Sequence, residues 1–198
     1  MVDSVPVDSV SFDQLFREAR TFSYFLPKPV APATLQAIHE LLKWGPTATN
    51  AQPGHFLFLV SPASRERLKP ALSTGNLAKT MAAPVTVVVA EDLQFHETLA
   101  TKFPHGNAQA WFDGQPALIA ETARRSSSLQ GAYFILAARA LGLDCGPMSG
   151  FDATQVDKEF FPDGRYRANF LINLGYGDRS RLHARLPRLT FDEACQIL

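Results

Sequence analysis

Apolar residues recur at helical spacing in two early stretches of the chain, and a later stretch is apolar nearly all round. The first pattern predicts a helix from Ser11 to about Arg20, with Ser11 and Gln14 as a capping box at its start. The second predicts a helix that opens at Pro32 and buries a stripe made of Leu35, Ile38, Leu41 and Leu42. Residues 129–143 are predicted to form a central helix that is buried on every side.

Four other apolar runs are too short for helices and predict strands, at 56–60, 84–90, 143–147 and 168–174. Further helices are predicted from their N-terminal capping residues, which are Ser61, Asp152 and Thr190. Residues 1–9 show no period and are predicted to be a flexible arm, which leaves residues 10–198 as a single domain. Because short strands alternate with long helices and no doubly wound nucleotide-binding pattern is visible, the sequence predicts an α+β fold.

Composition narrows the class of partner. The 198 residues include 19 basic and 19 acidic side chains and no basic tract, so binding to nucleic acid or to a membrane surface has no electrostatic support. No apolar run approaches the roughly 20 residues that cross a bilayer, and residues 1–11 lack the pattern of a signal peptide. Cys145 and Cys195 form neither a disulfide framework nor a metal-binding pattern. We therefore expect a cytoplasmic protein that acts on small molecules and holds no metal.

A polar loop between the second helix and the first strand is the most informative stretch. It follows Gly45, which is expected to end the helix in a left-handed conformation, and it closes at Pro53-Gly54. Its uncharged donors and acceptors suit the edge of a flat heterocycle better than a phosphate or a metal. These groups come from Thr47, Thr49, Asn50 and Gln52. The alternative interpretation is a turn whose polar groups cap its own backbone.

This loop resembles the signature of the flavin-dependent nitroreductase family, in which a helix is followed by Gly/Ala-Pro-Ser/Thr-x-x-Asn-x-Gln-Pro and an apolar strand. Within the family, the segments LLKWGPT, ALSTGNLAKTMAAPVT and LGLDCGPMSGFD are similar to the group named malonic semialdehyde (3-hydroxypropanoate) reductases or NADH dehydrogenase/nitroreductases. The similarity extends from about residue 12 to the C-terminus. It implies a nitroreductase fold, with a mostly antiparallel sheet wrapped by helices, in an intertwined homodimer that binds FMN at the subunit interface.

The resemblance implies that two backbone segments contact the flavin ring. One is the polar loop, which is expected to reach the flavin mainly from the partner chain, through Pro46, Thr47, Ala48 and Asn50. The other is a glycine-rich turn before the helix capped by Asp152, formed by Pro147, Met148, Ser149 and Gly150. The N–H groups of Ser149 and Gly150 are expected to donate to N5, the flavin atom that accepts hydride.

Polar and charged side chains are expected at other parts of the flavin. Asn76 and Lys79 share a helical face, and the resemblance places both at the pyrimidine and ribityl side. Lys79 is expected near N1 and O2, where reduction adds negative charge, and acts there as a catalytic residue. Arg20 and Thr21, together with Arg185 near the C-terminus, are expected to bind the phosphate. The family motif has a second basic residue after Arg20, where this chain has Phe22, Ser23 and Tyr24, and the sequence leaves open whether Ser23 replaces that contact.

Other polar residues have simpler interpretations. Three arginines are interpreted as partners of carboxylates on another chain or as solvent-exposed side chains, namely Arg124, Arg125 and Arg139. Cys145 is interpreted as a packed thiol, because no histidine and acid can be named as its catalytic partners. Residues 91–115 are predicted to be an irregular excursion in which Trp111 and Phe112 wall a substrate pocket or a subunit contact.

The activity implied by the resemblance is ping-pong hydride transfer through FMN, in which NADH or NADPH reduces the flavin and leaves before the acceptor binds. Malonic semialdehyde is favoured as the acceptor, and nitroaromatic compounds or quinones are the alternative. Two other classes stay open at this point. The first is a non-catalytic flavin carrier, and the second is an unrelated α+β module whose polar loop is only a turn.

Overall fold

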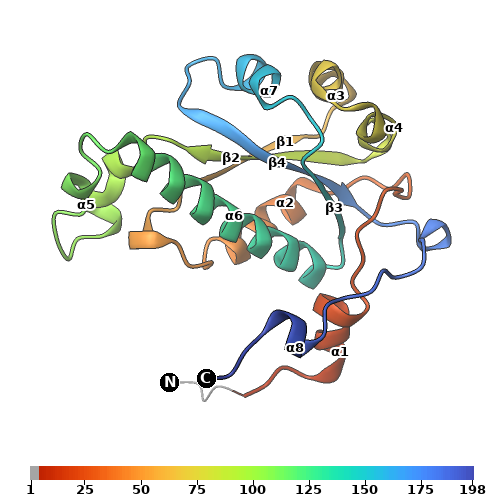
Figure 1. Ribbon diagram of the computed structural model, residues 1–198. Helices are drawn as coiled ribbons and strands as arrows, with labels where there is room; N and C mark the ends of the chain where they lie inside the picture. Colours follow the sequence, from red (N-terminus) through yellow and green to blue (C-terminus); the bar gives the residue numbers. More distant parts are fainter. Residues whose placement is uncertain (1–4) are drawn as a thin grey trace.

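A four-stranded antiparallel sheet lies at the centre of the computed structural model, which describes residues 5–198. The strands are β1 (Gly54–Leu59), β2 (Val85–Asp92), β3 (Asp144–Met148) and β4 (Tyr166–Gly175). Their order in the sheet is β1-β2-β4-β3, so β1 and β3 form the two edges (Figure 1). Each predicted strand is confirmed to within two residues at either end. Mixed helix and sheet, with this antiparallel core, confirm the α+β fold class.

Helices cover both faces of the sheet (Figure 1). On one face lie α2 (Pro32–Leu42) and the long α6 (Pro116–Ala140). On the other lie α3 (Pro62–Leu68), α4 (Thr74–Ala82) and α7 (Ala153–Phe160). Shorter α-helical segments are α1 (Ser9–Phe12), α5 (Leu99–Lys102) and α8 (Phe191–Ala194). The remaining turns are η1 (Asp13–Arg17), η2 (Ala48–Asn50), η3 (Lys69–Ala71), η4 (Phe95–Thr98), η5 (Gln109–Trp111) and η6 (Arg179–Arg181). No helix within residues 5–198 is long and apolar enough to cross a membrane.

The valine-rich strand β2 forms the middle of the hydrophobic core. Successive side chains of a strand point to opposite faces, so Val87 and Val89 pack toward α6 while Val88 and Ala90 pack toward α3 and α7. All four are fully buried, and each large apolar side chain buried in this way stabilises the fold by about 1.5–3 kcal/mol. A bulge between Val89 and Ala90 changes the register with β4.

Several local predictions for the first helix and its cap are wrong. The predicted helix from Ser11 to Arg20 is only the short α1, which continues as the π-helical turn η1. Its cap is Asp8, whose carboxylate accepts from the N–H of Ser11, so Ser11 and Gln14 form no capping box. Gln14 instead donates to the carbonyl of Arg139 at 2.7 Å. Of the predicted arm, residues 1–4 lie outside the described part of the chain, and residues 5–8 are exposed and non-helical.

The expected left-handed Gly45 is also wrong. Among the glycines only Gly114, Gly142 and Gly164 have positive φ within the described residues. Gly45 is required for a different reason, because a Cβ atom there would lie 2.8 Å from Cγ of Tyr133 on α6. Glycine therefore allows the end of α2 to approach α6 closely.

The prediction that residues 129–143 are buried on every side is wrong for the isolated chain. Leu129 is 44% exposed and Tyr133 is 38% exposed, whereas Phe134 and Ala138 on the same helix are fully buried. Leu41 on α2 is likewise 45% exposed, against the predicted stripe. These apolar residues therefore form surface that a second protein surface is able to cover.

The excursion at 91–115 is less irregular than predicted, because β2 runs through Asp92 and two short helical turns and α5 follow. Phe112 is buried against Phe95 and Leu99 in a small third core, so it cannot wall a pocket. Trp111 beside it is 55% exposed. The local core fixes the position of α5, which contacts the polar loop described below.

Candidate functional site

Arginine side chains from the two ends of the chain converge on one hollow. The hollow encloses about 560 Å³, and it brings together Arg20, Thr21 and Arg185, which the sequence predicted as one group. Ser23 also lines it, as do several basic residues that were not predicted, namely Arg139, Arg181, His183 and Arg188. No acidic residue is among the described residues that line it. The hollow is therefore strongly cationic.

The fold positions these arginines by pairing the N-terminal and C-terminal segments with the edge strand β3. Thr21 pairs in parallel with Cys145, and the N–H of Phe22 donates to the Cys145 carbonyl at 3.0 Å. The C-terminal segment returns beside it, where the N–H of Gly177 donates to the Asp144 carboxylate at 2.9 Å. Glycine is needed at position 146, because a Cβ atom there would lie 2.2 Å from the Phe22 carbonyl oxygen.

The guanidinium groups in the hollow bond to main-chain carbonyls and not to carboxylates. Nη2 of Arg20 donates to the His183 carbonyl at 2.6 Å, and Nη2 of Arg185 donates to the Arg17 carbonyl at 2.6 Å. Neither forms an ion pair with a carboxylate in the part of the chain that the structure describes. Because a guanidinium has five N–H donors, each side chain keeps several donors for an anion.

A second group of predicted residues meets at the far end of β3. The side-chain amide of Asn76, on α4, donates to the Gly150 carbonyl at 2.8 Å, and the N–H of Ser73 donates to the same oxygen at 3.1 Å. A Cβ atom at Gly150 would lie 2.5 Å from Nδ2 of Asn76, so a larger residue there would displace the Asn76 amide. The N–H groups of Ser149 and Gly150 have no acceptor among residues 5–198.

Lys79 lies one turn after Asn76 on the same face of α4. Its side chain is partly buried, and no carboxylate of residues 5–198 lies within ion-pair distance of it. Just before the turn, Met148 is fixed by a contact of 3.5 Å between its sulfur and Oγ1 of Thr80, while Pro147 is exposed. The second group thus combines free N–H donors with one unpaired cation.

Strand β3 connects the two groups. Thr21 pairs with Cys145 near its start, and the turn at Ser149 and Gly150 follows its last residue. Gly150 lies five positions after Cys145, and five steps of extended chain correspond to about 16 Å. The cationic hollow and the turn therefore lie along one edge of the sheet.

The polar loop lies elsewhere in the same chain. Its Ala48 N–H donates to Oγ of Ser126 in the first half of α6, and Nδ2 of Asn50 donates to the Lys102 carbonyl at 2.9 Å. The loop lies beside α5, whereas β3 follows the other end of α6 (Figure 1). A single chain does not bring Pro46, Thr47, Ala48 and Asn50 beside the turn at Ser149.

The interior of the polar loop is strained and internally bonded. Thr49, Asn50 and Gln52 have φ values of 51°, 52° and 48°, in the left-handed region that non-glycine residues avoid. The N–H of Gln52 donates to Oγ1 of Thr47, and Nε2 of Gln52 donates to Oδ1 of Asn50. Part of the hydrogen-bonding capacity of Thr47, Asn50 and Gln52 is therefore used within the loop itself. Lys102 adds a contact from α5, since its Nζ donates to the Ala51 carbonyl at 3.2 Å.

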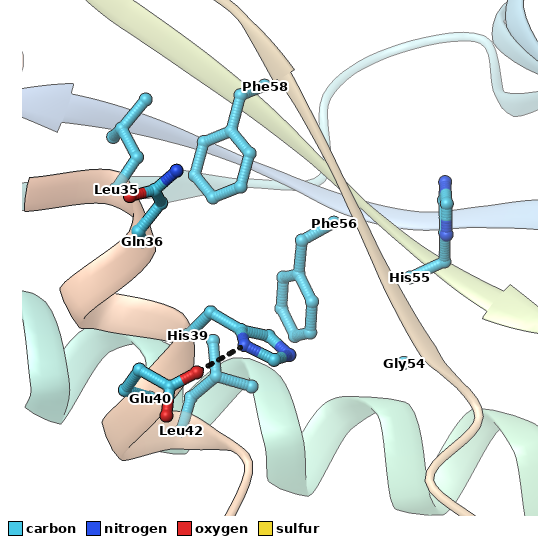
Figure 2. Close-up of a pocket in the computed structure, with 9 residues that line it drawn as sticks. All are labelled: Leu35, Gln36, His39, Glu40, Leu42, Gly54, His55, Phe56 and Phe58. Atoms are coloured by element: carbon cyan, nitrogen blue, oxygen red, sulfur yellow. Dashed lines mark ion pairs between the residues drawn. The ribbon is translucent and has the colours of Figure 1, made fainter. Parts of the chain in front are cut away.

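A second hollow, of about 630 Å³, contains none of the predicted residues. It lies between α2 and the edge strand β1, where Phe56 and Phe58 face the helix (Figure 2). His39 and Glu40 form an ion pair at its rim, with Nδ1 and Oε1 3.5 Å apart. It is a mainly apolar groove at an open sheet edge.

Burial shifts the pKa values of two titratable groups, the buried Cys145 and the partly buried His55. Burial raises the pKa of the Cys145 thiol to about 12, which makes it an inert packed thiol. Burial lowers the pKa of His55, whose ring stacks on Tyr166 with 4.1 Å between the ring centroids.

Two residues near the candidate site were missed by the sequence reasoning. Arg139 was interpreted as an ion pair or an exposed side chain, yet it lines the arginine hollow. The signal was present, because Arg139 interrupts an otherwise apolar helix. Lys102 gave no local signal, because its contact with the loop joins residues 51 positions apart.

The chain matches known proteins over nearly its whole length. Residues 16–176 match the family model described as "Nitroreductase family". A Stenotrophomonas maltophilia protein, named as an NADH dehydrogenase/NAD(P)H nitroreductase, is 58% identical over 191 residues, which cover 96% of this chain and 97% of that protein. A Bacillus subtilis structure assigned as a nitroreductase has a TM-score of 0.87 at 23% identity, covering 96% of this chain and 100% of the other. An Exiguobacterium sibiricum structure, assigned as a nitroreductase in complex with FMN, has a TM-score of 0.79 at 18% identity, covering 98% of this chain and 99% of the other. The chain belongs to the nitroreductase family.

Proposed function

We propose that the protein is an FMN-dependent NAD(P)H oxidoreductase that reduces a small organic acceptor. The observation that carries the proposal is the arrangement along β3, with a cationic hollow at one end and free N–H donors beside an unpaired lysine at the other. The family membership, the relative named as an NAD(P)H nitroreductase and the FMN complex among the similar structures support it.

The residues present fit the chemistry of FMN. Its phosphate is a dianion, and Arg20 and Arg185 retain unpaired N–H donors for charge-assisted hydrogen bonds, with Thr21 beside them. Its ring system carries carbonyl oxygens and ring nitrogens that accept hydrogen bonds. Asn76, Lys79 and the turn at Ser149 and Gly150 offer donors of that kind.

The chain's own residues would stabilise negative charge on the flavin ring and hold hydrogen-bond donors in fixed positions beside it. A bound FMN supplies hydride transfer between NADH or NADPH and an acceptor. Lys79 holds a positive charge for the edge of the ring that becomes anionic on reduction, and the N–H groups of Ser149 and Gly150 are fixed in place. They are fixed because the Gly150 carbonyl is tied to α4 by two hydrogen bonds.

The site is completed in this proposal by a second copy of the chain. Pro46, Thr47, Ala48 and Asn50 lie away from the turn within one chain, so a partner must supply them if they contact the flavin. Apolar side chains on α6 and the C-terminal segment are exposed in the single chain, as is expected for surface that a dimer buries. They include Leu129, Tyr133, Leu186, Leu189 and Ile197. A stable monomer that retains one FMN per chain in sedimentation experiments at high dilution would exclude this composite site.

Malonic semialdehyde is the proposed acceptor, on the basis of the sequence segments shared with reductases of that name. Its carboxylate needs a cation to offset desolvation. Arg124 on α6 is exposed and without an ion pair among the described residues, whereas Arg125 is paired with Glu121. Nitroaromatic compounds are the second candidate, because the relative at 58% identity carries the name NAD(P)H nitroreductase.

One experiment separates these functions. The purified protein is reduced anaerobically with NADH or NADPH and then mixed with malonic semialdehyde, nitrofurazone or menadione, while the flavin absorbance is followed. Rapid return of colour with the semialdehyde supports the proposal, and return with nitrofurazone alone assigns a nitroreductase. A bound flavin that neither NADH nor NADPH reduces would identify a flavin carrier. A colourless protein that binds no added FMN would refute the function altogether.

A further inference from the structure

Arg139 occupies an unusual position for a charged side chain. It lies in the last turn of α6, between Ala138 and Ala140, and is partly buried. Its Nη1 donates to the Leu15 carbonyl at 2.9 Å, while its Nε is buried and has no hydrogen-bond partner in the part of the chain that the structure describes. A guanidinium stays charged in proteins, so an unused buried donor is costly.

The surroundings of Arg139 indicate what the missing partner is. The side chain lines the same hollow as Arg20 and Arg185, although the three residues come from distant parts of the sequence. No carboxylate of residues 5–198 lines that hollow, and none of these residues forms an ion pair with Arg20, Arg139 or Arg185. Like charges gathered without a counterion repel one another, so the arrangement favours a bound anion of high charge density.

A purely structural role does not account for Arg139. Its bond to Leu15 uses one of five donors, and Gln14 on the same turn already ties η1 to the end of α6 through the Arg139 carbonyl. A neutral side chain could hold the Leu15 carbonyl without adding a further cation to a hollow that already contains Arg20, Arg181, Arg185 and Arg188. The positive charge of Arg139 therefore needs an explanation other than its bond to Leu15.

We propose that Arg139 is a third phosphate-binding residue, which donates to the phosphate of FMN together with Arg20 and Arg185. This inference rests on the proposed FMN function. It assigns to the end of α6 a direct contact with the cofactor. The phosphate dianion is the ligand, because the guanidinium groups that line the hollow carry more positive charge than a single carboxylate offsets.

The test compares FMN with riboflavin, which has the same ring and no phosphate. Binding of each to the flavin-stripped full-length protein is measured by quenching of flavin fluorescence, for the unaltered chain and for Arg139→Gln, Arg139→Lys and Arg125→Gln. Arg125 is the matched control, since it is an exposed arginine on the same helix. In Arg139→Gln the dissociation constant of FMN should rise roughly tenfold or more, as expected for one charge-assisted bond, while that of riboflavin changes little. Arg139→Lys should recover part of the FMN affinity, and Arg125→Gln should change neither.

Other outcomes overturn the inference. An equal loss of FMN and riboflavin binding in Arg139→Gln would mean that the side chain acts only by holding η1 in place. Unchanged affinity for both ligands would remove Arg139 from the site while leaving the proposed function intact. If the unaltered chain binds neither flavin, the proposed function and this inference fail together, so the two failures are distinguishable.

Discussion

Replacing Lys102 with methionine is expected to loosen the polar loop. A left-handed residue other than glycine or asparagine costs about 1–2 kcal/mol, so Thr49 and Gln52 together cost about 2–4 kcal/mol. Contacts from α5 and α6 must offset that cost for the loop to keep this shape. The bond from Nζ of Lys102 to the carbonyl of the fully buried Ala51 is one of the few that reach the loop from outside.

The magnitude follows from the type of bond. A hydrogen bond from a charged donor contributes about 1.5–3 kcal/mol, and the lower value applies here because Lys102 is only partly buried. Burial also lowers the pKa of Lys102, because partial desolvation disfavours the charged ammonium. A loss of about 1.5 kcal/mol raises the population of the opened loop roughly tenfold.

Amide hydrogen exchange measures this opening directly. The N–H groups of Ala51 and Gln52 are bonded within the loop, to the Ala48 carbonyl and to Oγ1 of Thr47. Their exchange should be roughly tenfold faster in Lys102→Met, in proportion to the opening equilibrium. Lys158→Met, the same change at an exposed lysine on α7, is the control, and Lys102→Arg should restore slow exchange. Equal loop exchange in Lys102→Met and the control would refute the reasoning.

Three further predictions concern stability and thiol chemistry. Because burial lowers the folded-state pKa of His55 from 6.5, the contribution of neutral His55 to stability is complete above pH 6.5 and is lost as the pH falls through the folded pKa. The free energy of unfolding in urea should therefore fall less between pH 7.5 and pH 5 for His55→Gln than for the unaltered chain, and equal falls would contradict this. In the native protein a thiol reagent should modify the exposed Cys195 and not Cys145, whereas denaturant should expose both, and two reactive thiols in the native state would disprove the packed thiol. Gly146→Ala should lower the midpoint of thermal unfolding, because its Cβ atom would meet a carbonyl oxygen and overpacking costs about 1–3 kcal/mol. The control Gly75→Ala, on α4 with open space around it, should raise the midpoint slightly. An unchanged midpoint in Gly146→Ala would show that the edge of β3 adapts to the added methyl group.

The sequence alone determined the elements whose signals are local. Strand β2 follows from a run of β-branched residues that suits no other environment, and Asp152 caps α7 through its bond to the N–H of Gln155, as predicted. The capping box of Thr190 and Glu193 at α8 is also confirmed. Each of these signals depends on residues within one or two turns, so no distant contact is needed to identify it. The motif around the polar loop was specific enough to indicate the family.

Tertiary structure decided the features that depend on residues far apart in the chain. The N-terminal prediction failed because Gln14 bonds to the end of α6, and a local pattern cannot reveal a competitor 125 positions away. Three left-handed residues in the polar loop are held by contacts from α5 and α6, which no propensity at Thr49 or Asn50 reports. Arg139 was assigned to solvent or a partner chain because helical periodicity gives only the direction of a side chain. Folding places it beside Arg20 and Arg185, since β3 begins just after α6 and pairs with the N-terminal segment.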